Sequence, residues 1–207
     1  MFEWLAGKAL VGAVGALTGV RPIWKGCAPA DVARVYYGNH SSHGDVIVIW
    51  TSLPPTLRGK TRPVAGSDYW LKSRLRSYFA TRVFNAVLVD RDPKTRQGDP
   101  IATMIEAVDQ GASLILFPEG TRNTTDARLL PFKSGIHRLA QARPQLEFVP
   151  VWLENLNRVM PKGEVVPIPL LCTTTFGEPL RLIESEAKEA FLDRCRDALL
   201  ALAPSRS

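Results

Sequence analysis

An apolar run leads directly into a polar turn in the stretch Leu114-Ile115-Leu116-Phe117-Pro118-Glu119-Gly120-Thr121-Arg122-Asn123. The apolar run is typical of a buried strand, and it ends where the polar residues begin. Helical patterns stand on both sides, at Ile101–Asp109 and Ser134–Ala142. A strand between helices is the repeating unit of an α/β protein.

The rest of the chain continues this alternation, which predicts an α/β fold with a mainly parallel sheet flanked by helices. Leu53–Pro63, with three prolines, is the only stretch that resembles a linker. The predicted strands are Val32–Tyr36, Val87–Val89, Ser113–Phe117, Phe148–Trp152 and Leu171–Phe176. The predicted helices are Val46–Ser52, Ser67–Phe84, Ile101–Asp109, Ser134–Ala142 and Glu184–Ala203.

The N-terminal segment Leu5–Val20 is apolar except for Lys8 and Thr18. It is shorter than the roughly 20 residues that span a bilayer, and no basic region precedes it as in a signal peptide. Tryptophans and basic residues at its ends are typical of a helix that lies in one leaflet: Trp4, Trp24, Arg21 and Lys25. We therefore expect residues 1–25 to associate with a membrane; a buried core helix is the alternative.

The composition is that of a globular protein, with 45% hydrophobic and 22% charged residues in a chain of 207. A net charge of +6 favours anionic partners, which include nucleic acid, anionic lipid and acidic substrates. Much of this charge lies between residues 58 and 96, a stretch that contains ten basic residues and only three aspartates. The basic residues are Arg58, Lys60, Arg62, Lys72, Arg74, Arg76, Arg82, Arg91, Lys94 and Arg96.

The predicted helix Ser67–Phe84 is amphipathic and basic. It is compatible either with a membrane-facing surface or with a solvated face packed on the core. The three cysteines, Cys27, Cys172 and Cys195, are odd in number and widely spaced. This pattern favours reduced, structural cysteines in a cytoplasmic compartment, with neither a disulfide framework nor a metal site.

Two histidines and a carboxylate fall in the turn Asn39-His40-Ser41-Ser42-His43-Gly44-Asp45, after the first predicted strand. A carboxylate that fixes the tautomer of an imidazole makes it a useful general base, so His40 and Asp45 are candidates for a catalytic dyad. The alternatives are that Asp45 only caps the helix and that His40 is a surface histidine.

The turn after Phe117 has the features of an anion site. Gly120 allows close approach of the backbone, Thr121 offers a hydroxyl, and Arg122 offers a fork of donors suited to phosphate. An ordinary turn after a strand would show the same residues.

Together, the His40-x-x-x-x-Asp45 pattern and the segment from Phe117 to Asn123 resemble the glycerolipid acyltransferase family, of the lysophosphatidate acyltransferase type. The resemblance implies that His40 and Asp45 form the catalytic dyad. It also implies that Glu119, Gly120, Thr121 and Arg122 lie where the glycerol phosphate of the acyl acceptor binds. His43 falls at a variable position of the first motif.

Further segments carry the same resemblance over residues 32 to 180. Asn85-Ala86-Val87-Leu88-Val89-Asp90-Arg91 is similar to the family's second motif and implies Arg91 as a phosphate ligand, although Asn85 replaces a glycine and Leu88 a phenylalanine. Other matching segments are Phe132-Lys133-Ser134-Gly135, Val149-Pro150-Val151 and Phe176-Gly177-Glu178-Pro179-Leu180. Residues 26–207 are thus expected to form the acyltransferase domain.

The reaction that the resemblance implies moves a fatty acyl group from acyl-CoA or acyl carrier protein to the sn-2 hydroxyl of 1-acylglycerol 3-phosphate, giving phosphatidate. Another lysolipid or glycerol 3-phosphate is the alternative acceptor. Neither a metal nor another cofactor is expected, and the partners are membrane lipids rather than nucleic acid. The expected location is the cytoplasmic face of the cell membrane, without crossing it.

Functions of other classes have weaker support. A lipid esterase or thioesterase could use the same dyad, but the chain has no GxSxG motif. Gly59-Lys60-Thr61 is similar to the end of a nucleotide-binding P-loop, but Pro54 stands where the first glycine is required. A non-catalytic lipid-binding module also remains as an alternative.

Overall fold

The computed structural model describes residues 2–42, 44–90, 98–154 and 172–204. Within these ranges seven strands form one sheet, in the order β1-β7-β6-β2-β5-β3-β4. The strands are β1 (Arg21–Trp24), β2 (Arg34–Gly38), β3 (Thr61–Gly66), β4 (Val87–Val89), β5 (Ser113–Leu116), β6 (Glu147–Glu154) and β7 (Thr173–Phe176). Only the pair β6 and β7 is antiparallel among these strands, so the predicted α/β fold with a mainly parallel sheet is confirmed.

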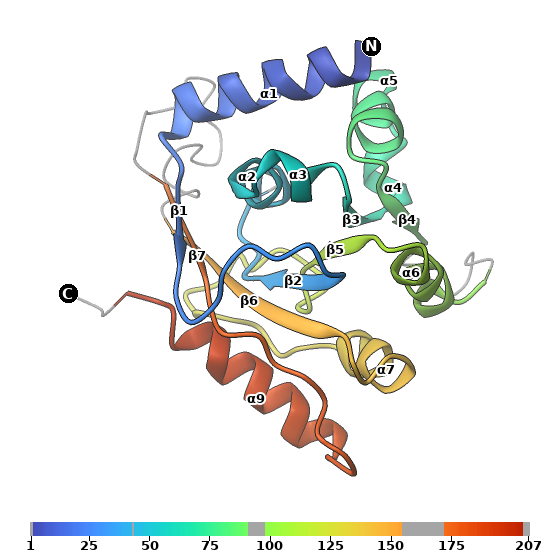
Figure 1. Ribbon diagram of the computed structural model, residues 1–207, viewed down its shortest axis with the longest axis vertical. Coiled ribbons are helices and arrows are strands. Elements are labelled where there is room, and N and C mark those ends of the chain that lie inside the picture. The colour runs from blue at the N-terminus through green and yellow to red at the C-terminus, as the bar shows by residue number, and fades with distance from the viewer. Residues whose placement is uncertain (1, 43, 91–97, 155–171, 205–207) are drawn as a thin grey trace.

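Helices cover both faces of this sheet (Figure 1). On one side lie α1 (Phe2–Thr18), α2 (Asp45–Ser52), α3 (Pro55–Arg58), α4 (Ser67–Trp70), α5 (Arg74–Tyr78) and the π-helical turn Phe79–Val83. On the other side lie α6 (Pro100–Asp109), α7 (Gly135–Ala142) and α9 (Lys188–Leu200). Buried parallel sheets require such cover on both faces, because neither face can be left to solvent.

The central strands divide their side chains between two hydrophobic clusters. Leu114 and Leu116 of β5 belong to the cluster that includes α6, α7 and α9, whereas Ile115 belongs to the cluster beneath α1 and α2. In β2, Tyr37 and Tyr36 divide in the same way. Successive side chains of a strand point to opposite faces, so short apolar runs fill both layers of the core.

The N-terminal segment is built into this domain. Leu10, Val11 and Val14 of α1 pack against the second cluster, and β1 pairs with β7 at the edge of the sheet. The ring of Trp24 stacks on Phe176, with centroids 4.0 Å apart. The last part of the predicted segment 1–25 thus belongs to the sheet, and no helix among the described residues is long and apolar enough to cross a bilayer.

The prediction of a linker at Leu53–Pro63 is wrong, because this stretch forms α3 and the start of β3. Proline lacks the N–H that a strand ladder uses, so it fits a strand best where one neighbouring strand is missing. In the structure β5 pairs with β3 over Thr61–Pro63, and β4 pairs with it only from Val64 onward. Pro63 therefore has a paired neighbour on one side only.

The single helix predicted for Ser67–Phe84 is also wrong. Ser73 leaves the helical conformation, and its side chain accepts a hydrogen bond from the main-chain N–H of Arg76, which begins a new helix. Serine favours such capping over an interior helical position. The break divides the predicted helix into α4, α5 and the π-helical turn that follows.

Part of the basic stretch between residues 58 and 96 has a structural use. The guanidinium of Arg58 donates hydrogen bonds to the main-chain oxygens of Trp50, Thr51 and Leu53, where α2 ends, and it lies 5.2 Å from the centre of the Trp50 ring. The last carbonyls of a helix have no partner within it, so Arg58 satisfies the C-terminus of α2. Lys60 instead forms an exposed ion pair with Asp31.

We expect Arg58→Met to lower the free energy of unfolding by about 2 kcal/mol, because it removes charge-assisted bonds to helix-end carbonyls. Lys60→Met is the matched control; its surface ion pair contributes less than about 1 kcal/mol. Urea denaturation of both variants measures the difference. Equal losses would show that the contacts of Arg58 add nothing beyond its charge.

Candidate functional site

His40 and Asp45 are in contact in the loop between β2 and α2. The Nδ1 atom of His40 lies 2.9 Å from Oδ2 of Asp45, and the same carboxylate oxygen accepts the main-chain N–H groups of Ser41 and Ser42. Asp45 is fully buried, whereas the side chain of His40 is 20% exposed. Because Asp45 acts as an acceptor, Nδ1 carries the proton in a neutral ring, and Nε2 is left with a lone pair.

The ring of His40 is also held by Phe117. The two rings stack with centroids 4.3 Å apart and planes 15° apart. Phe117 follows β5, and β5 is the neighbour of β2 in the sheet. Parallel neighbours end at the same edge, so the two sequence motifs meet although about seventy residues separate them.

Glu119 joins these two loops through the main chain. Its Oε1 accepts the N–H of His40 at 2.9 Å, and its Oε2 accepts the N–H of Leu130 at 2.7 Å. Burial raises the pKa of this carboxyl, while the two N–H bonds act in the opposite direction. Glu119 is only 2% exposed, so the structure places it behind the loops rather than on the open side of the site.

Asn39 fixes the same loop to β6. Its side-chain oxygen accepts the N–H of Leu153, and its side-chain nitrogen donates to the carbonyl of Leu153. The main-chain oxygen of His40 accepts the N–H of Asn123. His40 is thus held by contacts to segments on both sides of β2.

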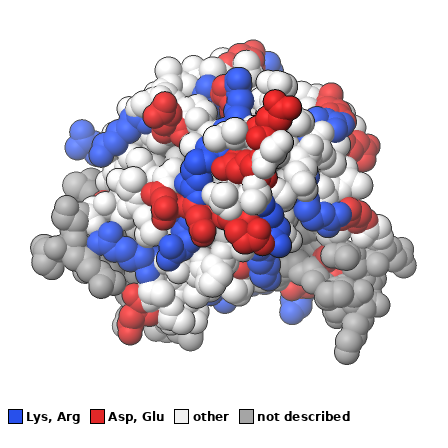
Figure 2. All heavy atoms as spheres, turned by 90° about the horizontal axis from the view of Figure 1, so that it is seen from below, with Lys and Arg blue, Asp and Glu red and all other residues white. Residues whose placement is uncertain are grey.

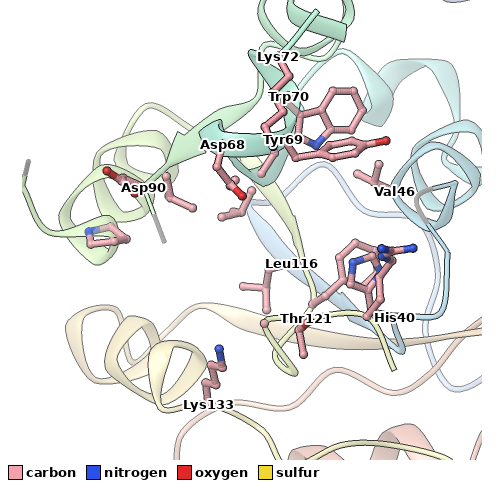
Figure 3. A pocket seen from close by; sticks show the side chains of 18 residues that line it. His40, Val46, Asp68, Tyr69, Trp70, Lys72, Asp90, Leu116, Thr121 and Lys133 are labelled. Carbon is pink, nitrogen blue, oxygen red and sulfur yellow. The ribbon is translucent and has the colours of Figure 1, made fainter. Parts of the chain in front are cut away.

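His40 of the predicted dyad lines a pocket of about 1060 Å³ that lies between the turn after β5 and the segments of β3, β4 and α4 above it (Figure 3). Thr121 and Lys133 lie on the lower side in this view, and Asp68 and Asp90 lie on the opposite side. The complete lining is His40, Val46, Val64, Ala65, Gly66, Asp68, Tyr69, Trp70, Lys72, Val89, Asp90, Pro100, Leu116, Phe117, Gly120, Thr121, Arg122 and Lys133.

Most of the predicted site residues therefore meet at one place. Gly120, Thr121 and Arg122 line the pocket with His40, and Thr121 and Arg122 are exposed there. Asp45 and Glu119 lie behind the pocket, as described above. Arg91 and His43 lie outside the described residues.

Several residues of the pocket were not predicted as site residues, among them Tyr69, Trp70 and Lys133. Lys133 belongs to Phe132-Lys133-Ser134-Gly135, a segment that carries the family resemblance, so the sequence offered a reason to consider it as a site residue. Tyr69 and Trp70 appeared only as part of an amphipathic helix. No group of three or more His, Cys, Asp or Glu side chains among the described residues is arranged to hold a metal ion.

Known proteins resemble the part of the chain that contains the loop of His40 and the turn after Phe117. The Acyltransferase family model matches residues 27–154, more than half of the chain. A 1-acyl-sn-glycerol-3-phosphate acyltransferase of Limnanthes alba is 30% identical over 178 residues, which cover 80% of this chain and 57% of that protein. The human 1-acyl-sn-glycerol-3-phosphate acyltransferase alpha is 31% identical over 141 residues, 66% of this chain and 46% of that protein.

The fold has a solved counterpart. The crystal structure of the 1-acyl-sn-glycerophosphate acyltransferase PlsC from Thermotoga maritima superposes with a TM-score of 0.72 at 19% identity, covering 97% of this chain and 80% of that one. The chain spans about half the length of the two curated relatives described above. The family match, which contains both loops of the pocket, shows that this chain belongs to the acyltransferase family.

Proposed function

We propose that this protein transfers a fatty acyl group from a thioester, acyl-CoA or acyl carrier protein, to the sn-2 hydroxyl of 1-acylglycerol 3-phosphate. The observation that carries the proposal is the contact of 2.9 Å between His40 and Asp45 at a pocket that also contains Arg122. The names of the relatives support the acceptor. The size of the pocket suits an amphiphilic substrate.

In the proposed mechanism, Nε2 of His40 removes the proton of the acceptor hydroxyl as the oxygen attacks the thioester carbonyl. The new ester C–O bond forms, the C–S bond breaks, and His40 returns the proton to the departing thiolate. The buried carboxylate of Asp45 stabilises the imidazolium formed in between. No acyl-enzyme and no metal are part of this scheme.

Arg122 is proposed to orient the acceptor. Its guanidinium is exposed on the turn that follows Phe117, and it has no ion-pair partner within the described part of the chain. A guanidinium can bind two phosphate oxygens at once, so the acceptor would be held with its hydroxyl directed toward His40. Arg91 is proposed as a second phosphate ligand on the family resemblance alone.

One prediction of this mechanism concerns the dyad. His40→Ala and Asp45→Asn should each lower kcat by about 10²- to 10⁴-fold, since general base catalysis contributes about this much. Purified protein is assayed with 1-acylglycerol 3-phosphate and one acyl-CoA, and release of free fatty acid is followed as a test for hydrolysis. His43→Ala is the control, and a folded His40→Ala enzyme with full activity would exclude the mechanism.

Another prediction concerns Arg122. Arg122→Ala should raise the KM for the phosphorylated acceptor by about 10- to 150-fold, which corresponds to the loss of one charge-assisted contact of about 1.5–3 kcal/mol. The KM for the acyl donor should stay within about twofold, given that the donor is not bound by this group. Equal increases for both substrates would contradict the assignment.

We also propose that the protein binds peripherally to anionic membranes through α1 and the region of α4 and α5. The amino end of α1 lies beside α5 (Figure 1). Leu5, Leu71 and Leu75 are 50%, 50% and 67% exposed, and the basic Lys72, Arg74 and Arg76 are exposed beside them in the sequence. Exposed leucines next to basic side chains suit an anionic bilayer surface.

The opposite side of the molecule differs in charge. Seen from below, where α9 lies, acidic and basic side chains are interspersed (Figure 2). Arg194 of α9 forms an ion pair with Glu186, and Arg181 forms one with Glu147. The described residues of this side therefore present charges of both signs, which do not favour anionic lipid.

A further prediction tests this surface with substitutions in the full chain, so that β1 keeps its place in the sheet. Leu71→Ser/Leu75→Ser should weaken binding to anionic liposomes at high salt, and Lys72→Gln/Arg74→Gln should weaken it chiefly at low salt, because only charge attraction is screened by ions. Flotation of the full chain with vesicles measures both effects. Ile183→Ser, which removes a 58% exposed side chain near α9, is the matched control; an equal loss with this variant would exclude the proposed surface.

A further inference from the structure

Lys133 is positioned at the pocket by its own main chain and by the residues on either side of it. Its main-chain N–H donates to the carbonyl of Pro118 at 2.8 Å. The preceding Phe132 packs edge-on against Tyr37, with centroids 6.3 Å apart. The following Ser134 is the residue from which α7 begins. The position of Lys133 beside the turn is therefore fixed by the fold and not by its own charge.

The side chain of Lys133 passes directly over Gly120. A Cβ atom at Gly120 would lie 2.8 Å from Cδ, Cε and Nζ of Lys133. This is shorter than the van der Waals contacts that Cβ atoms make in proteins, so any other residue at this position would displace the lysine side chain. Gly120 also has a φ of +68°, in the left-handed region that favours glycine. The glycine thus serves two purposes: it turns the backbone, and it leaves room for the end of the lysine side chain.

The ammonium of Lys133 is available to a ligand. The residue is exposed, lines the same pocket as His40 and Arg122, and forms no ion pair within the described ranges of the chain. In Figure 3 its side chain points from the lower side into the pocket. A lysine placed in this way is a compact charge suited to a phosphate.

We infer that Lys133 binds the phosphate of the acyl acceptor together with Arg122, and that Gly120 contributes by giving the lysine its path rather than by contacting the phosphate itself. This inference rests on the proposed function for the identity of the acceptor. It adds a binding residue and assigns Gly120 a positioning function that acts through Lys133.

The first experiment compares Lys133→Met and Lys133→Arg with wild type. Lys133→Met should raise the KM for 1-acylglycerol 3-phosphate at least tenfold and leave activity on monoacylglycerol, which has no phosphate, within twofold. Lys133→Arg should retain acceptor binding within about threefold. Lys188→Met, which removes a surface lysine paired with Glu189, is the control for net charge and should change neither value.

The second experiment is a double-mutant cycle with Gly120. Gly120→Ala should raise the acceptor KM in wild type but add no further increase in the Lys133→Met background, because the displaced side chain no longer binds phosphate. The left-handed φ strains alanine in either background, so the loss in Tm should be the same in both. Additive effects on KM would show that Gly120 acts independently of Lys133.

Calorimetric binding of sn-glycerol 3-phosphate gives a readout without turnover, and Lys133→Met should weaken it at least tenfold. If wild type transfers no acyl group, the proposed function fails, while this measurement still tests Lys133. If wild type is active and Lys133→Met binds the phosphate normally, only the present inference is overturned. Equal losses on the phosphorylated and the phosphate-free acceptor would overturn it as well.

Discussion

The carboxylate of Glu119 connects the two loops on which the pocket depends. One oxygen accepts the N–H of His40 and the other accepts the N–H of Leu130, and the side chain is almost completely buried. A buried N–H without a partner would cost about 1–3 kcal/mol. The hydrogen bonds of Glu119 therefore hold its own turn, the loop of His40 and the segment of Leu130 together. The imidazole of His40 is consequently positioned from behind by a residue 79 positions away.

Strand order makes this arrangement possible. β2 lies between β5 and β6, so the loop that follows it touches the ends of both neighbours. Phe117 after β5 stacks on His40, and Leu153 in β6 is paired with Asn39 by two hydrogen bonds. The rigid edge of the parallel sheet therefore carries the groups proposed to act on substrate, while α4 and the end of β4 close the opposite side of the pocket. Loops on such a scaffold can hold reactive groups in a fixed geometry.

The basic residues of the chain have different structural and proposed functional roles, and the net charge does not distinguish them. Arg58 satisfies the carbonyls at the end of α2, and Lys60 pairs with Asp31 at the surface. Arg122 and Lys133, which stand outside the densest basic stretch, face the pocket. The net positive charge of the chain accounts for long-range attraction of anions. Binding of a particular anion depends on the few cationic side chains that the fold leaves without an ion pair and brings together.

The sequence by itself determined the α/β class, most strand and helix positions, the two motifs and their family, because these depend on local periodicity and on residue types at fixed spacing. It did not predict β1, and it gave a linker at Leu53–Pro63 and one helix at Ser67–Phe84, where pairing with β5 and the cap at Ser73 outweighed local patterns. Only the tertiary structure showed that Glu119 bonds main-chain groups and that Lys133 lies over Gly120. These features are contacts between distant segments, and they are decided by which strands are neighbours and how closely the loops pack.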